Sequence, residues 1–384
     1  MSLLIPNRSD RLEELVGTAI TDLDIPDVLN ALAIERYQDV GAWLDEHWAV
    51  SSDDGVIYPQ GSFRLGTVVR PVNPKDHYDI DLVCRRDLLK ESTTQIELKR
   101  DVGAGLRAYV ATEPNGQPTC DEGKRCWTLE YRGEPFHMDI LPAIPNVESP
   151  TNAIWLTDKA LLRWQPSNPV DFATWFHARM REAFLSEREV VAKRMEVEDV
   201  PDWRVKTPLQ RTVQALKRHR DIYFAETPED RPASIIITTL AALAYSAAGS
   251  LYETLIDVSE TMPKLVEVRD GVYWVANPVH PAENFADRWR GNPVRARNFF
   301  DWIEQAHADF SGYGVDDGVD RVLTKLSESF GEQPAKRAGE LMGLNLTKAR
   351  DTGVLGVSGA GLLGLTASRS VPRHTFHGDP PDPR

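Results

Sequence analysis

The segment Tyr78–Val83 (YDIDLV) alternates between apolar and acidic residues in steps of two, and this pattern constrains the fold more than any other feature of the chain. Side chains of a β-strand point alternately to opposite faces. The pattern therefore predicts a strand with Asp79 and Asp81 on one face and apolar residues on the other. The later segment Phe136–Ile140 (FHMDI) repeats the alternation with a single aspartate, Asp139. We expect two strands whose acidic faces can be brought together.

Three carboxylates that lie close together repel one another unless cations neutralise them. Carboxylate oxygens suit Mg²⁺, which often keeps part of its coordination for substrate phosphates. Two such ions, about 3.5–4 Å apart, can stabilise both the attacking and the leaving oxygen of a phosphoryl or nucleotidyl transfer. We predict that Asp79, Asp81 and Asp139 are catalytic residues that bind two Mg²⁺ ions, with Mn²⁺ as an alternative.

The composition is that of an ordinary globular protein, with 41% hydrophobic and 27% charged residues in a chain of 384 residues. This length is sufficient for two domains or lobes. The net charge of −14 would repel long DNA or RNA on average, because nucleic-acid affinity depends on neutralising phosphates. We therefore expect small phosphorylated partners, nucleoside triphosphates, rather than long nucleic acid.

Targeting signals are not evident in the sequence. The first residues lack the charged region of a signal peptide, and no apolar stretch approaches the length of a membrane span. Three cysteines do not make a disulfide framework. The expected location is the cytoplasm, without membrane attachment.

The first part of the chain mixes helical and strand patterns, and the signal from about residue 170 onward is almost wholly helical. We expect helices over 27–48, 91–112, 174–193, 209–224, 234–248, 298–310 and 319–330, strands over 56–59, 79–85, 127–131 and 136–141, and a loop over 113–124. The last two strands flank a turn and predict an antiparallel hairpin. The fold class is α+β: a catalytic lobe with a mixed sheet and N-terminal helices (residues 1–165) packs against a helical lobe (residues 166–345). Residues 346–384, rich in Gly and Pro, are expected to form a mobile tail.

Further residues are candidates for binding phosphate. Gly61-Ser62 lies about one strand upstream of the paired aspartates, where a tight turn can offer amide hydrogens and a hydroxyl. The helix expected over 209–224 carries basic residues around an apolar stripe. These residues either form a solvated basic face or include Lys217 as a cation that holds a triphosphate. Ser234, at the start of the next helix, would cap that helix, donate to a phosphate, or both.

The combination QGSFRLGT at 60–67, YDIDLV at 78–83 and MDI at 138–140 resembles the signature of polymerase β-like nucleotidyltransferases. The residues around these motifs resemble those of the bacterial CD-NTase family, relatives of animal cyclic GMP–AMP synthase and oligoadenylate synthase. Stretches at 207–221, 232–240 and 277–289 are also similar to that family, so the resemblance spans roughly residues 10–345. No HExxH, GxSxG or GxxxxGK[ST] motif supports a zinc protease, serine hydrolase or P-loop ATPase.

The resemblance implies a bilobal enzyme whose cleft binds two nucleoside triphosphates with Mg²⁺. Asp79 and Asp81 would bind both metal ions, and Asp139 would complete the site and help to lower the pKa of the attacking ribose hydroxyl. Gln60, Gly61 and Ser62 would bind the donor nucleotide, with Lys217 and Ser234 holding its phosphates from the helical lobe. Such enzymes make cyclic di- or trinucleotides in anti-phage CBASS systems.

The chain departs from animal cyclic GMP–AMP synthase in two respects. Ile235 replaces the tyrosine that follows the phosphate-binding serine, and neither the His/Cys zinc insertion nor a basic DNA-binding surface has a counterpart. The segment HTFHG at 374–378 resembles the tail of family members whose operons encode regulatory or ubiquitin-transfer-like partners. Partners of that kind are therefore expected at the C-terminal tail.

Three functions remain open from the residues. The first is a cyclic oligonucleotide synthase, and the second is a template-independent transferase that modifies an RNA end or a protein hydroxyl. The third is a nucleotide-binding sensor without catalysis, which the presence of all three aspartates makes the least favoured. Base identity, ring size, linkage and activating signal do not follow from the sequence.

Overall fold

The computed structural model describes residues 8–48, 57–149, 152–157, 164–195, 201–247, 249–314, 317–357, 363–364 and 369–371. The chain divides into two compact units. One comprises Leu23–His307, and the other comprises Met1–Asp22 together with Ala308–Arg384. None of the helices formed by the described residues is long and apolar enough to cross a membrane.

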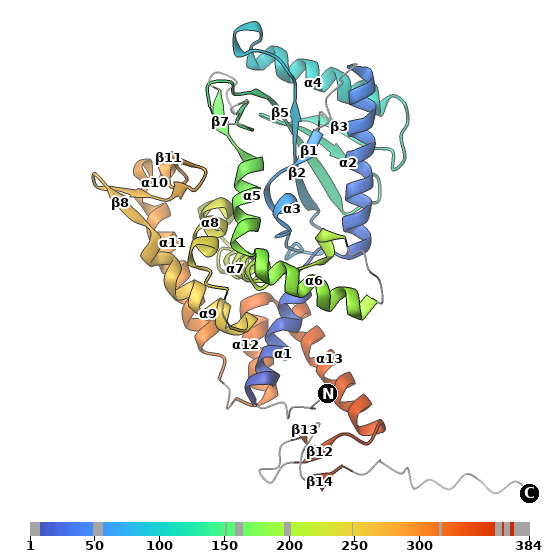
Figure 1. Ribbon diagram of the computed structural model, residues 1–384, viewed down its shortest axis with the longest axis vertical. Coiled ribbons are helices and arrows are strands. Elements are labelled where there is room, and N and C mark those ends of the chain that lie inside the picture. Colours follow the sequence, from blue (N-terminus) through green and yellow to red (C-terminus); the bar gives the residue numbers. More distant parts are fainter. Residues whose placement is uncertain are drawn as a thin grey trace, which may run out of the picture. The chain divides into compact units, whose positions relative to one another are not determined.

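A seven-stranded sheet forms the core of the unit Leu23–His307 (Figure 1). Its strands run in the order β1-β2-β5-β4-β3, and β6 and β7 continue from β5. The strands are β1 Ile57–Pro59, β2 Tyr78–Arg85, β3 Thr119–Glu122, β4 Trp127–Glu130, β5 Phe136–Pro145, β6 Ile154–Leu156 and β7 Gln165–Ser167. β2 and β5 are parallel, and the other described pairs of this sheet are antiparallel. The mixed sheet confirms the predicted α+β class, and the antiparallel pair β4–β5 confirms the predicted hairpin.

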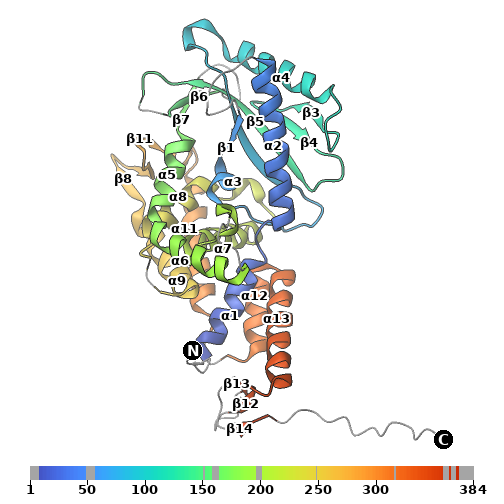
Figure 2. The same ribbon diagram turned by 45° about the vertical axis from the view of Figure 1, so that its right-hand side comes forward.

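The apolar face of the sheet packs against two helices, α2 (Asp27–His47) and α4 (Gln95–Val110), which Figures 1 and 2 show beside it. The alternating apolar residues of β2 and β5 are fully buried in this core: Ile80, Leu82, Met138 and Ile140. A short 3₁₀ helix, η1 (Lys90–Ser92), precedes α4. Thr94 and Glu97 form a capping box that defines where α4 begins. The core therefore fixes which face of the two strands carries the aspartates.

One expected loop is wrong. The segment 113–124 contains β3, which pairs with β4 at the edge of the sheet. Its residues are exposed or half-buried, so the strand has no apolar face and lacks the usual alternating signal. The prolines and glycines around it favoured a loop. Pairing with β4, rather than hydrophobic burial, makes this segment a strand.

The rest of the unit is mainly helical. Its helices are α3 Gly61–Leu65, α5 Pro169–Arg179, α6 Arg181–Met195, η2 Asp202–Arg204, α7 Pro208–Tyr223, η3 Pro228–Asp230, α8 Ser234–Ala244, α9 Leu251–Thr261, η4 Met262–Leu265, α10 Asp287–Gly291 and α11 Pro293–Ser311, whose last residues pass into the other unit. Two small hairpins, β8 Glu267–Arg269 with β9 Val272–Trp274 and β10 Ala276–Asn277 with β11 His280–Asn284, interrupt the helices. α9 was not among the expected helices.

The helix expected over 174–193 is instead two helices, α5 and α6, separated at Met180. The amide of Met180 donates to the carbonyl of His177, three residues back, which ends the four-residue ladder of α5. Met180 is buried, and its sulfur lies 2.9 Å from the hydroxyl of Thr207. The break allows the Met180 side chain to reach the interior and contact Thr207. A local helical pattern does not predict such a tertiary contact.

The second unit is a helical group formed from both ends of the chain. α1 (Arg8–Thr21), which the sequence analysis placed with the catalytic lobe, packs against α12 (Val319–Phe330) and α13 (Glu332–Asp351). Short strands follow: β12 Gly356–Val357, β13 Leu363–Gly364 and β14 Arg369–Ser370. α13 includes the first six residues of the expected tail, and 374–378 lies outside the described residues. The lobe boundaries themselves stay predictions.

Candidate active site

The parallel pairing of β2 and β5 brings the predicted carboxylates together. In its register Asp79 lies opposite His137, and Asp81 lies opposite Asp139. All four residues occupy the face away from α2 and α4, because the residues between them are buried in the core on the other face. The structure thus places the three predicted aspartates side by side on two neighbouring strands.

Oxygen and nitrogen donors at this face are close enough to share one cation. One ligand atom from each of Asp79, His137 and Asp139 lies within 4.8 Å of the other two. His137 Nε2 lies 3.5 Å from Asp79 Oδ1, and the hydrogen bond to Asp79 raises the pKa of His137. The alternation of FHMDI at 136–140 puts His137 on the same face as Asp139, but the sequence analysis did not assign His137 as a ligand. We therefore add His137 to the candidate metal ligands.

Asp81 lies where an ionised carboxylate is disfavoured unless a cation is bound. Burial, and then the negative charges of Asp79 and Asp139, raise the pKa of Asp81 to about 7. Arg125 and Lys217 oppose this shift, but they do not cancel it. A bound divalent ion would stabilise the ionised carboxylate, which is otherwise costly at this position.

Asp139 is held in place by the strand on its other side. Thr128 of β4 lies opposite Asp139 in the antiparallel ladder, and its hydroxyl donates to Asp139 Oδ1 at 2.6 Å. Cys126, two residues before Thr128, lies close enough that burial and the charge of Asp139 together raise the pKa of its thiol. β4 therefore orients the third carboxylate, while the thiol beside it stays protonated.

The Gly61-Ser62 turn lies directly beside Asp81. The amide of Gln60 donates to the Asp81 carbonyl at 2.9 Å, and the one-turn helix α3 begins at Gly61. Gly61 has φ +58°, and a Cβ added there would lie 2.9 Å from Asp81 Oδ2. A glycine is needed at this position for both reasons. The structure thus brings the predicted turn and the predicted carboxylates together.

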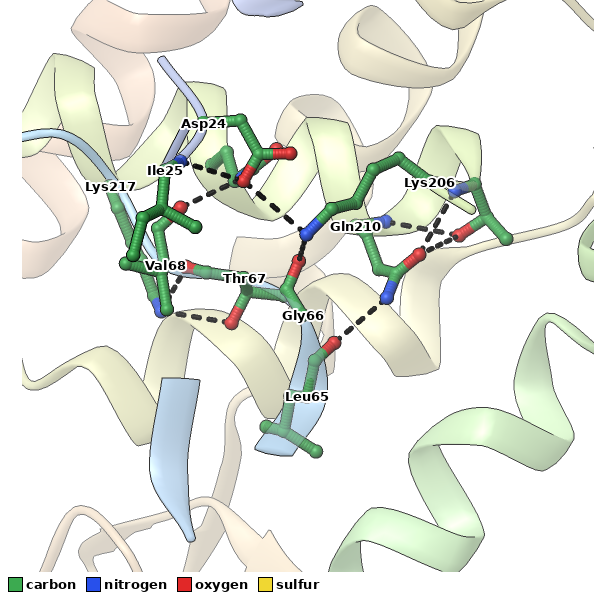
Figure 3. Close-up of polar contacts among 11 residues, drawn as sticks. Asp24, Ile25, Leu65, Gly66, Thr67, Val68, Lys206, Gln210 and Lys217 are labelled. Atoms are coloured by element: carbon green, nitrogen blue, oxygen red, sulfur yellow. Dashed lines mark hydrogen bonds and ion pairs between the residues drawn. The ribbon is translucent and has the colours of Figure 1, made fainter. Parts of the chain in front are cut away.

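Lys217 is buried on α7, and the interpretation of this helix as carrying a solvated basic face is wrong. Lys217, Arg218 and Arg220 are each at most 6% exposed. The Lys217 ammonium donates to both the carbonyl and the hydroxyl oxygen of Thr67, each at 3.1 Å (Figure 3). Burial lowers the pKa of Lys217 to about 7, and the charge of Asp81 acts against this shift. Lys217 is therefore within electrostatic reach of the carboxylates.

Ser234 is the first residue of α8, but it does not cap the helix. Ala233 occupies the N-cap position, where no side chain accepts a capping hydrogen bond. The hydroxyl of Ser234 accepts a hydrogen bond from Arg220 Nη1 at 2.8 Å, and Arg220 is also paired with Asp221. This network connects Ser234 to α7, while its predicted contact with phosphate stays a prediction.

Side chains from α7 and the residue before its cap also contact the segment that follows the Gly61-Ser62 turn, a feature that the sequence analysis missed. Gln210 donates to the Leu65 carbonyl at 2.9 Å, and Lys206 donates to the Gly66 carbonyl at 3.0 Å (Figure 3). The available signal was the spacing of four between Gln210 and Gln214, because it places these two polar side chains on one face of α7.

Comparisons with known proteins agree with this arrangement. A family model described as the nucleotidyltransferase domain of DncV-like cyclic GMP-AMP synthases matches residues 56–142. The c-di-GMP synthase of Roseivirga ehrenbergii is 28% identical over 385 residues, which cover 98% of this chain and 100% of the relative. The cyclic dinucleotide synthase CdnG of Bradyrhizobium diazoefficiens is 26% identical over 312 residues, which cover 73% of this chain and 71% of the relative.

A solved structure supports the same fold. The Bradyrhizobium diazoefficiens CdnG structure, determined in complex with GTP, matches with a TM-score of 0.67 at 23% identity and covers 86% of this chain and 99% of that one. Together with the mixed sheet, these matches define the protein as a nucleotidyltransferase with a polymerase β-like fold. The matches in sequence and structure together support the assignment of this chain to the bacterial CD-NTase family.

Proposed function

We propose that this enzyme joins nucleoside triphosphates into a cyclic oligonucleotide and releases pyrophosphate. In each step a ribose hydroxyl oxygen forms a bond to the α-phosphorus of a second nucleotide. The bond from that phosphorus to the pyrophosphate oxygen breaks, and the hydroxyl loses its proton. The observation that carries the proposal is the pairing of Asp81 with Asp139 across β2 and β5, directly beside the Gly61-Ser62 turn.

The relatives favour a cyclic dinucleotide as the product. One is named a c-di-GMP synthase and aligns along almost the whole chain, and the other is named a cyclic dinucleotide synthase. The CdnG structure contains GTP. GTP is therefore the first substrate to test, although neither the base nor the linkage follows from the residues at the site.

The described residues fit a site for divalent cations. Asp79, Asp81 and Asp139 would hold two Mg²⁺ ions, or Mn²⁺, with His137 beside them. The raised pKa of Asp81 supports a bound cation, and hard oxygen ligands are those that Mg²⁺ prefers. When bound, the ions supply charge neutralisation for the phosphates and the leaving pyrophosphate.

The protein side chains have separate tasks in this scheme. Thr128 keeps Asp139 oriented by its hydrogen bond, so that this carboxylate faces the attacking ribose hydroxyl. Gly61 allows the backbone to pass close to the carboxylates, where the amides and hydroxyl of the Gly61-Ser62 turn would bind the donor phosphates. The Lys217 ammonium donates two of its three hydrogens to Thr67 and would donate the third to the triphosphate, and Ser234 would bind the same phosphates from α8.

We further propose that the product is a second messenger in anti-phage (CBASS) defence and that the enzyme works in the cytoplasm. The family resemblance supports the first statement. The second is consistent with the free thiols of Cys84, Cys120 and Cys126. Partners that act on the tail around residues 374–378 stay a prediction.

Labelled nucleotides test the proposal. The purified protein is incubated with labelled nucleoside triphosphates, Mg²⁺ and host lysate, and the products are treated with phosphatase and separated. A small phosphatase-resistant product supports the synthase. Label on RNA or protein would instead support a template-independent transferase, and binding without turnover would support a nucleotide sensor.

Two paired variants make the test specific to the site. Asp79→Ala with Asp81→Ala should abolish the product while the protein stays folded. Asp257→Ala with Glu328→Ala removes two exposed carboxylates of α9 and α12 and should leave it unchanged. Full activity of the first pair would contradict the assignment of these aspartates.

A further inference from the structure

The one-turn helix α3, which begins with the Gly61-Ser62 turn, is too short to be stable by itself. A helix of five residues forms too few hydrogen bonds to offset the cost of nucleation. Its start is attached to β2 by the hydrogen bond from the Gln60 amide to the Asp81 carbonyl. Its end needs a comparable attachment if the turn is to keep one conformation.

That attachment is supplied by a row of polar side chains that we call the α7 clamp: Lys206, Gln210, Gln214, Lys217 and Arg218. Each donates a hydrogen bond to a backbone carbonyl in the segment 65–70, namely Gly66, Leu65, Val68, Thr67 and Arg70 respectively. Four of the clamp residues, Gln210, Gln214, Lys217 and Arg218, share one face of α7 through their helical spacing, and Lys206 lies just before the N-cap residue of that helix. Figure 3 shows the members around Leu65–Val68.

The clamp lies in the interior of the protein. Gln210 is 4% exposed and Gln214 is fully buried. A buried carbonyl left without a donor pays the cost of its desolvation, so these bonds are strongly favoured over any shifted arrangement. The backbone of 65–70 is therefore held in register with α7 rather than free to slide along it.

Gln210 has the central place in this contact. Its Nε2 donates to the Leu65 carbonyl at the C-terminal end of α3. Its Oε1 accepts the Thr207 amide and so completes the capping box of α7. The fit is close, because a Cβ added at Gly66 would lie 2.4 Å from Gln210 Nε2. One side chain thus fixes the start of α7 and the end of α3 together.

Two phosphate-binding elements are therefore joined through one helix. α7 carries Lys217, the predicted triphosphate cation, and it also holds the end of the turn that contains Gly61 and Ser62. We propose that Gln210 is a positioning residue of the triphosphate site, which sets the turn at the correct place relative to Lys217 through the Leu65 carbonyl. This role rests on the proposed function, because it requires that the turn and Lys217 bind the same triphosphate.

Two uncharged variants distinguish the effect of Gln210 on the position of the Gly61-Ser62 turn from its effect on the stability of α7. Gln210→Met removes the donor to Leu65 and also the capping acceptor, without adding charge near an anionic ligand. Thr207→Val removes the other half of the same capping box but keeps the bond from Gln210 to Leu65. Both variants should lose stability, since an N-cap contributes about 1 kcal/mol. A difference between them reports the bond to Leu65.

The measurement is the affinity of each full-length variant for inorganic tripolyphosphate with Mg²⁺, by calorimetry, together with KM and kcat for nucleotide. We expect Gln210→Met to weaken tripolyphosphate binding and raise KM by about tenfold, the equivalent of one buried hydrogen bond, with a smaller change in kcat. Thr207→Val should bind like the unmodified protein. Should Gln210→Met not fold, Gln210→Glu replaces it, because a carboxylate keeps the acceptor for the Thr207 amide and lacks the donor to the Leu65 carbonyl.

The outcomes separate this inference from the proposed function. Equal effects of Gln210→Met and Thr207→Val, or unchanged affinity in Gln210→Met, would overturn the positioning role while the synthase assignment stands. Tripolyphosphate binding that depends on Gln210, in a protein that makes no cyclic product, would support the positioning role and contradict the synthase. Absence of tripolyphosphate binding in the unmodified protein would overturn the positioning role, while formation of the cyclic product decides the synthase assignment separately.

Discussion

Lys217 and Thr67, 150 residues apart in the sequence, form a buried contact in which one ammonium binds both polar oxygens of the threonine, each at 3.1 Å. The contact joins α7 to the segment that follows the Gly61-Ser62 turn. Because burial holds the pKa of Lys217 near 7, the ammonium is poorly compensated without a ligand. An incoming triphosphate would provide the missing negative charge.

Replacement of Lys217 by Met should change how stability depends on pH. Between about pH 7 and 10 the lysine is mostly neutral in the folded protein but protonated in the unfolded chain. The unfolded state therefore binds more protons at this residue, and Lys217 contributes a rise in the free energy of unfolding with pH of up to about 1.4 kcal/mol per unit. Lys217→Met should lack this rise, as measured by urea unfolding of nucleotide-free protein. A rise identical in both proteins would remove Lys217 as its source.

The same variant should lose the proton uptake that accompanies nucleotide binding. Near pH 8 the buried lysine is largely neutral, and a bound triphosphate favours its charged form, so binding takes up a proton. Calorimetry of tripolyphosphate binding in buffers of different ionisation enthalpy measures this uptake. Lys336→Met, which changes an exposed lysine of α13, is the control and should behave like the unmodified protein. Retention of the uptake in Lys217→Met would contradict the proposed contact.

Substitution of Gly61 by Ala should impair both stability and activity. The φ of +58° costs a residue with a Cβ about 1–2 kcal/mol, and the Cβ would approach Asp81 Oδ2 to 2.9 Å. We expect product formation to fall much more than the melting temperature. Gly343→Ala is a matched control in α13, where a Cβ meets nothing within 4 Å, and it should be neutral or slightly stabilising. Normal turnover in Gly61→Ala would show that the turn need not approach the carboxylates.

Asp81→Asn should abolish activity and raise the stability of the metal-free protein. It removes a half-buried charge that Asp79 and Asp139 repel, so in EDTA the variant should be more stable than the unmodified protein by about 1–2 kcal/mol. Mg²⁺ should raise the melting temperature of the unmodified protein but not that of the variant, which should also be inactive. Equal stabilisation of both proteins by Mg²⁺ would place the metal elsewhere.

Local patterns predicted the strands at the site, whereas the contacts between distant segments required the structure. The alternation of Tyr78–Val83 and Phe136–Ile140 is a property of adjacent residues, and it assigned the faces of β2 and β5 correctly. The pairing of Asp81 with Asp139 depends on the crossover between these strands, which no local pattern specifies.

The α7 clamp shows why polar interior residues were misinterpreted. Glutamine, lysine and arginine at helical spacing are typical of a solvated face, and that interpretation fits most helices. Here their partners are backbone carbonyls about 140–150 residues earlier in the chain. Main-chain acceptors carry no side-chain signature, so the sequence gives no sign of the segment that these side chains bind.

The most direct test of the central claim is mass spectrometry of the phosphatase-treated products formed from all four ribonucleoside triphosphates with Mg²⁺. The account predicts a phosphatase-resistant cyclic oligonucleotide. When each nucleotide is supplied alone, GTP is the first to be tested as a substrate. Activity should disappear in the variant that lacks both Asp79 and Asp81. Products that phosphatase converts entirely to nucleosides, even after host lysate is added, would contradict the assignment of this chain as a cyclic oligonucleotide synthase.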